Sequence, residues 1–158
     1  MADDDEVTYD TKPTGDEDQI PDYEGETLFE RLGGVYGIAG AVDVLVDRLY
    51  ENDAANENPA VQEFHNTYGK EGFKYLVTAW SIEYSGGPAV YPGRGMQDAH
   101  DDLEVTERGF DVVRTEIKNT LYHVGVPHQE MTEFMNIIDM FRDKVVADKH
   151  RDESWEAP

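Results

Sequence analysis

Apolar residues recur at helical spacing through the middle of the chain, and this pattern limits the possible folds more than any other feature. Residues 35–51 carry an apolar face with charged side chains on the other side. That face consists of Ile38, Val42, Leu45 and Leu49. Similar stripes occupy residues 70–84, 106–123 and 127–147. No segment alternates with the two-residue period of a strand, and no Asn-Gly hairpin signal occurs. The sequence therefore predicts an all-α fold.

Glycine, proline and capping residues mark the ends of these helices. Thr27 and Glu30 have capping-box spacing at the start of a short helix over residues 28–32. Thr106 is placed to cap the helix that follows it. Gly33-Gly34, Gly86-Gly87-Pro88 and Gly125 interrupt the pattern. Residues 52–68 form a polar connector, in which we expect one or two short turns with Phe64 tucked inward.

The 158 residues predict one folded domain between two charged segments. Residues 1–25 are rich in acids and show no apolar period, so we expect a disordered tail there. The folded domain should cover residues 26–147. Residues 148–158 read as a charged terminal extension.

The charge balance excludes two classes of partner. Thirty-five acidic residues against 13 basic ones give a net charge of −22. Binding to nucleic acid or to an anionic membrane surface needs clustered lysine and arginine, which this chain lacks. Such an acidic surplus is typical of proteins from salt-adapted organisms, where concentrated salt screens the repulsion between carboxylates. An ordinary acidic protein is the alternative.

The chain contains no cysteine, which excludes disulfides, thiolate catalysis and iron–sulfur ligation. No apolar run approaches the length of a membrane span, and the N-terminus is acidic where a signal peptide would be basic. We therefore expect a soluble, cytoplasmic protein with no membrane partner.

One histidine stands in a glycine-rich, polar stretch, YPGRGMQDAHDDLEVT, at residues 91–106. A neutral imidazole is a common protein ligand for iron, and one proximal histidine can carry the attachment of a haem. His100 is therefore a candidate metal ligand. On residue type alone, a solvated side chain is the alternative.

The order of several motifs resembles the truncated haemoglobins, most closely their group I. An aromatic residue, a Gly-Arg pair, a methionine and a histidine four residues later match the proximal pattern of that family. These are Tyr91, Gly93, Arg94, Met96 and His100, followed by Val105 and Thr106. The resemblance extends to LFERLGGVYGIA at residues 28–39 and to GFKYLVTAW at residues 72–80. It includes the Gly86-Gly87-Pro88 triplet and covers most of residues 28–146.

The resemblance implies a truncated globin fold, a two-over-two helical sandwich of two crossed antiparallel helix pairs. Haem b would lie between the helix of residues 70–84 and the loop that carries His100, the proximal ligand. A backbone carbonyl of that loop or Asp101 would accept a hydrogen bond from the other ring nitrogen. Met96 would pack on the macrocycle or simply in the core. Arg94 would pair with a haem propionate or stay exposed. Phe64 is expected to line the pocket.

On the distal side, the chain departs from the family pattern of a tyrosine and a glutamine that bind the gas ligand. The matching positions are the apolar residues Val46, Phe73 and Val77. Without a hydrogen-bond donor, oxygen should bind weakly relative to carbon monoxide or nitric oxide. Substitute donors are Trp80, Tyr75, Tyr50, His65 and Tyr68, of which His65 is the candidate sixth ligand.

The function implied by the resemblance is reversible binding or transport of oxygen or related diatomic gases (NO, CO), with a reductase as a possible partner. A haem enzyme, either a nitric oxide dioxygenase or a weak peroxidase, is the alternative from another class. A haemless helical interaction protein is the third reading. In that case Phe73, Val77 and Trp80 would fill the space of the porphyrin.

Overall fold

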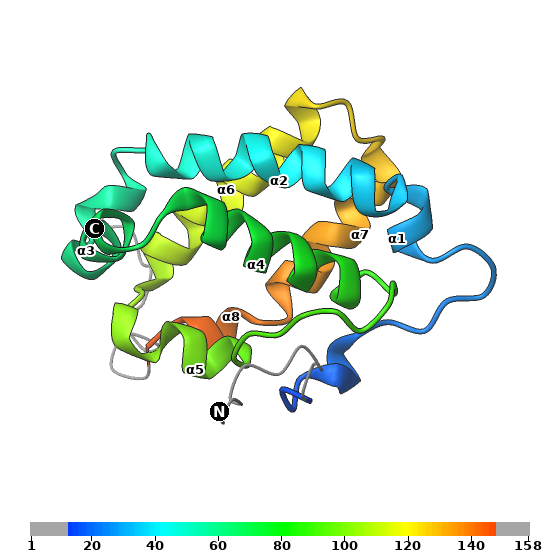
Figure 1. The fold of residues 1–158 in the computed structure, drawn as a ribbon, viewed down its shortest axis with the longest axis horizontal. Coiled ribbons are helices and arrows are strands. Elements are labelled where there is room, and N and C mark those ends of the chain that lie inside the picture. The colour runs from blue at the N-terminus through cyan, green and yellow to red at the C-terminus, as the bar shows by residue number, and fades with distance from the viewer. Residues whose placement is uncertain (1–12, 148–158) are drawn as a thin grey trace, which may run out of the picture.

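The structure is a computed structural model that describes residues 13–147, and within them the regular structure is helical (Figure 1). The one exception there is an isolated parallel bridge between Val105 and Val146. The all-α prediction is therefore confirmed. The elements are η1 (Glu17–Gln19), α1 (Leu28–Arg31), α2 (Gly34–Tyr50), η2 (Ala55–Glu57), α3 (Pro59–Thr67), α4 (Lys70–Tyr84), α5 (Met96–His100), η3 (Asp101–Leu103), α6 (Glu107–His123), α7 (His128–Asp139) and α8 (Arg142–Val145).

Two helix pairs make the body of the protein. In Figure 1, α2 and α4 run along each other and cross in front of α6 and α7. The main core lies between these layers and includes residues of α1, α4, α6 and α7. It contains Leu28, Tyr84, Ile137 and Phe141, each at most 1% exposed. This is the expected two-over-two helical sandwich. None of the helices within residues 13–147 is both long and apolar enough to cross a bilayer.

Local sequence signals set several helix ends as expected. The Glu30 amide donates to Thr27 Oγ1 at 3.1 Å, and the Thr27 amide donates to Glu30 Oε1 at 2.9 Å, which completes the capping box of α1. The Gly109 amide donates to Thr106 Oγ1 at 2.9 Å at the start of α6. Gly33 adopts a φ of 95°, which permits the sharp turn between α1 and α2.

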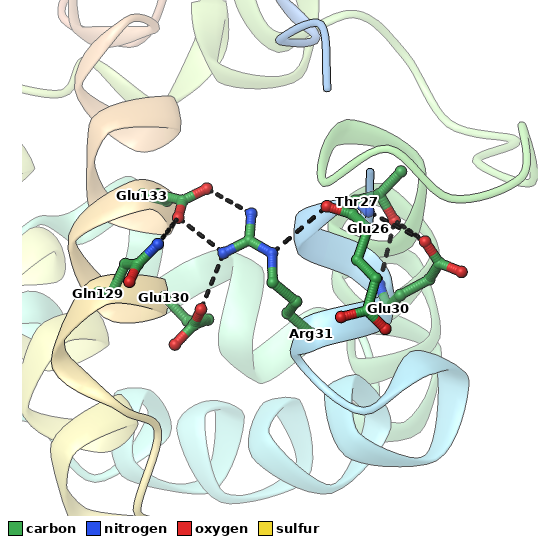
Figure 2. A network of polar contacts seen from close by, with 7 residues as sticks. All are labelled: Glu26, Thr27, Glu30, Arg31, Gln129, Glu130 and Glu133. Atoms are coloured by element: carbon green, nitrogen blue, oxygen red, sulfur yellow. Dashed lines mark hydrogen bonds and ion pairs between the residues drawn. The ribbon is translucent and has the colours of Figure 1, made fainter. Parts of the chain in front are cut away.

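An arginine in α1 ties that short helix to α7 (Figure 2). Arg31 donates through both terminal nitrogens to Glu133 at 2.7 Å and through one of them to Glu130 at 2.8 Å. The guanidinium lowers the pKa of the Glu133 carboxyl, chiefly by hydrogen bonding. The fork of Arg31 therefore fixes the angle at which α1 meets the second helix pair.

The connector after α2 contains more helix than the sequence predicts. Residues 59–67 form α3 in place of one or two short turns. The Asn58 side chain accepts from the Ala60 amide at 2.9 Å, and Pro59 takes a first-turn position, where its missing N–H costs nothing. Phe64 is half-buried on this helix, so the expected inward placement holds in part.

The last helix is interrupted, whereas the sequence pattern predicts one continuous helix to residue 147. Helix α7 ends at Asp139, and α8 starts at Arg142. Phe141 lies between them at 1% exposure, with its ring edge against Trp80 and Tyr84. Burying this aromatic ring offsets the loss of helical hydrogen bonds at the break.

The sequence predicts a disordered acidic tail over residues 1–25, and within it residues 13–25 make specific polar contacts. Thr14 Oγ1 lies 2.7 Å from the Tyr84 hydroxyl, and Asp16 is 4% exposed in contact with α5 and α8. Acid-rich composition predicts disorder when charges stay solvated, but here specific partners bind the polar groups. Residues 1–12, and the predicted extension over residues 148–158, lie outside the described residues.

Candidate functional site

His100 is the last residue of α5, and its ring is held by the same helix. Nδ1 lies 2.8 Å from the Met96 carbonyl oxygen, which can only accept, so Nδ1 carries the proton. This carbonyl fills the role predicted for the loop backbone or Asp101. Burial has the largest effect and lowers the pKa of His100. The hydrogen bond to the Met96 carbonyl opposes it, and the charges of Arg94, which lowers the pKa, and Asp101, which raises it, have smaller effects. The ring is therefore neutral, and Nε2 has no hydrogen-bond partner among residues 13–147.

The loop between α4 and α5 is fixed by its own polar contacts. The Tyr91 amide donates to the Glu83 carboxylate at 3.0 Å, and the Tyr91 hydroxyl donates to the Arg94 carbonyl at 2.7 Å. A side chain at Gly93 would collide with the Tyr91 ring, so the close approach requires glycine. Together these contacts set where α5 begins and therefore where His100 lies.

The other two proximal candidates have different environments. Met96 is half-buried and packs against the main core. Arg94 is exposed, and within residues 13–147 its guanidinium forms no ion pair. Met96 therefore serves the core in this structure, while the Arg94 side chain is exposed beside the loop.

The structure brings the predicted distal residues together. Val46 is fully buried in a second core cluster with Ile38, Val42 and Ile82. Phe73 and Val77 are half-buried against this cluster. The Phe64 ring meets Phe73 edge-on at 5.6 Å. These side chains form a continuous apolar wall along the first half of α4.

Trp80 lies in the main core and not in this apolar wall. Its ring stacks on Tyr84 at 4.8 Å and meets Phe141 edge-on at 5.6 Å, inside the main core. Phe73, Val77 and Trp80 are therefore divided between two clusters and do not form the single plug that a haemless protein would need. The side chains of Tyr68 and Tyr75 are largely exposed, at 60% and 59%.

Two of the substitute donors form a pair beside the apolar wall. The rings of Tyr50 and His65 are stacked at 3.8 Å, and the Tyr50 ring lies 6.2 Å from that of Phe73. His65 Nδ1 lies 2.8 Å from Asn56 Oδ1, and burial lowers the pKa of His65. The Tyr50 hydroxyl is buried and has no hydrogen-bond partner among residues 13–147. Sequence reasoning named both residues but missed the pairing, because it depends on α3.

A small cavity lies apart from these residues. It measures about 50 Å³, is partly open to solvent and is lined by residues of α2, α4, α6 and α7. Its walls are mostly apolar and include Ile38, Ala41, Leu45, Ile117 and Leu121. None of the predicted haem-binding residues lines it. It has room for only one or a few very small molecules.

The comparisons with known proteins agree on one family. The family model described as bacterial-like globin matches residues 27–147. A group 1 truncated haemoglobin from Synechocystis sp. is 32% identical over 117 residues, which is 68% of this chain and 85% of that protein. The group 1 truncated haemoglobin of Tetrahymena thermophila is 26% identical, over 73% of this chain and 91% of the relative.

Solved structures with the same fold include the Fe(III) form of a truncated haemoglobin from Tetrahymena pyriformis. It has a TM-score of 0.69 and 22% identity, over 77% of this chain and 99% of that one. The 2/2 haemoglobin of a Synechococcus species, solved in the cyanomet state with covalently attached haem, has a TM-score of 0.69 at 25% identity. That match covers 77% of this chain and 98% of the other.

Proposed function

Because the chain belongs to the bacterial-like globin family, we propose that it binds haem b through His100 and uses it to bind small diatomic gases reversibly. One observation carries the proposal. His100 is neutral, its Nδ1–H is fixed on the Met96 carbonyl, and its Nε2 has no partner among the described residues. An imidazole oriented by its second nitrogen in this way is a typical metal ligand. When bound, haem would supply an iron atom able to bind gases.

The partly exposed apolar wall supports the proposal that an apolar cofactor binds here. Phe64, Phe73 and Val77 are only half-buried, and Leu76 is 37% exposed, so apolar surface remains uncovered in this structure. Covering such surface with an apolar cofactor is favourable. The exposed Arg94 guanidinium is available for a carboxylate such as a haem propionate.

The gas side is predominantly apolar. Val46, Phe73 and Val77 offer no donor, so they exclude water and leave a gas ligand without polar contacts. The Tyr50 hydroxyl is the exception, because it is buried, unpaired and next to Phe73. We propose that Tyr50 donates the one hydrogen bond to a polarised ligand and that His65, stacked on it, holds its ring in place.

A hemin titration in high salt tests this function. The parent protein should develop a sharp Soret band that saturates at one equivalent and shifts with carbon monoxide after reduction. His100→Ala should lose or alter the band, whereas His128→Ala, at an exposed position, should match the parent. No saturable band in the parent, or an unchanged band in His100→Ala, would contradict the proposal. Nitrate formed from an oxygenated sample and nitric oxide faster than by free haem would favour a nitric oxide dioxygenase.

A further inference from the structure

Asp16 is a buried carboxylate far from His100 in sequence, with both oxygens engaged. Oδ2 accepts from the Met96 amide at 2.9 Å, and Oδ1 pairs with the Lys144 ammonium. The residue is 4% exposed. Burying a carboxylate costs free energy unless its oxygens find partners, and here they bind two separate elements, α5 and α8.

Asp16 binds the amide of Met96, the residue whose carbonyl orients His100. Met96 is the first residue of α5, and Gly95 before it has no side chain with which to cap the helix. Asp16 supplies the missing acceptor from 80 residues away. The carbonyl of the same Met96 receives the proton-bearing Nδ1 of His100 at 2.8 Å. The backbone of Met96 is thus held by Asp16 at its amide and holds the imidazole at its carbonyl.

The segment around Asp16 is itself anchored. Thr14 Oγ1 lies 2.7 Å from the hydroxyl of Tyr84, a core residue at the end of α4. A Cβ on Gly95 would lie 3.0 Å from the Thr14 carbonyl oxygen, so the two backbones approach closely. Helix α8, which carries Lys144, packs against α5. Residues 14–16 therefore connect α4, α5 and α8 at the point where α5 starts.

We infer that Asp16 is a positioning residue for His100. It fixes the Met96 backbone and thereby the direction in which Nε2 points, which sets how tightly the histidine holds its ligand. The inference rests on the proposed function of haem binding for its consequence, but the positioning itself is a property of the haem-free chain. A purely structural role would stabilise the segment without affecting the His100 ring.

The test compares Asp16→Asn with Asp18→Asn. The control removes the same charge from an exposed residue two positions along the chain. In the haem-free proteins, nitrogen NMR should show that Asp16→Asn shifts both the Met96 amide and the His100 ring nitrogens, while Asp18→Asn shifts neither. With hemin bound, Asp16→Asn should lose it to excess apomyoglobin about tenfold faster than the parent. Its reduced form should also show a displaced iron–histidine stretching band.

Three outcomes distinguish the positioning role of Asp16 from the proposed haem-binding function. A Met96 amide that shifts while the His100 ring signals stay fixed would overturn the inference. So would a lower thermal midpoint of Asp16→Asn with unchanged hemin loss. A parent protein that takes up no hemin would refute the proposed function alone, since the NMR comparison still decides the inference. If Asp16→Asn does not fold, Lys144→Gln, which breaks the ion pair and keeps Asp16, carries the same test.

Discussion

Replacing Tyr50 with phenylalanine should have opposite effects on the haem-free protein and on its oxygen complex. The Tyr50 hydroxyl is buried and lacks a partner within the described part of the haem-free chain, residues 13–147. An unsatisfied buried polar group costs about 1 to 3 kcal/mol. Tyr50→Phe should therefore raise the free energy of unfolding of the haem-free protein by about 1 kcal/mol, at the low end of that range because the ring itself is only half-buried. Its thermal midpoint should rise by about 2 to 4 °C.

In the haem-loaded protein the same substitution removes the proposed donor. A hydrogen bond to a charged acceptor contributes about 1.5 to 3 kcal/mol, so the dissociation constant for oxygen should rise roughly 10- to 150-fold. Carbon monoxide carries little negative charge, so its dissociation constant should change by less than about threefold. Association and dissociation rates for both gases, measured by flash photolysis and rapid mixing, give these constants.

The matched control is Tyr36→Phe, because Tyr36 is 93% exposed on the same helix and should change neither gas affinity nor stability. A Tyr50→Phe protein that is less stable without haem would show that the hydroxyl has a partner. An unchanged ratio of oxygen to carbon monoxide affinity would refute the role of Tyr50 as donor and leave the gas side wholly apolar.

Three further predictions concern stability. Burial lowers the pKa of His65 from 6.5, so the folded state takes up its proton less readily than the unfolded chain. Stability should therefore be greatest above pH 6.5 and fall as the pH drops below 6.5, which urea unfolding at a series of pH values would show. His65→Gln should reduce this slope without abolishing it, because burial also lowers the pKa of His100; a parent that gains stability on acidification would contradict the prediction. Raising potassium chloride from about 0.1 M to about 1 M shortens the Debye length from about 10 Å to about 3 Å. Because this screens the repulsion within a chain of net charge −22, the thermal midpoint should rise. A constant or falling midpoint would exclude salt adaptation. Leu121→Ala should enlarge the cavity between the helix pairs and cost about 2 to 5 kcal/mol in chemical unfolding, whereas the exposed Val124→Ala should cost less than about 0.5 kcal/mol.

Much of the fold follows from local signals. The apolar stripes place α2, α4 and α6 within a residue or two, because helical periodicity and capping act over one or two turns. The break between α7 and α8, where the sequence predicts one continuous helix, has a cause of longer range. Phe141 continues the stripe of α7, yet contact with Trp80 and Tyr84 draws it out of the helix. A pattern within one segment cannot show which distant ring it will meet.

The candidate site also depends partly on signals along the sequence and partly on tertiary contacts. The resemblance to the truncated haemoglobins singles out His100, Met96 and the apolar series Val46, Phe73 and Val77, since these positions match the family's motifs along the chain. The Tyr50–His65 stack and the unpaired hydroxyl depend on α3 folding back against α2. Trp80, a plausible donor by position, turns into the main core.

The helical class and most helix starts can be predicted from the sequence, since they depend on residues within a few positions of one another, and the family resemblance points to His100 as the candidate iron ligand. What surrounds that histidine depends on tertiary contacts. Acid-rich composition predicts disorder for residues 13–25, yet Asp16 finds the Met96 amide and the Lys144 ammonium. Whether a carboxylate remains in water or is buried depends on partners brought from 80 and 128 residues away.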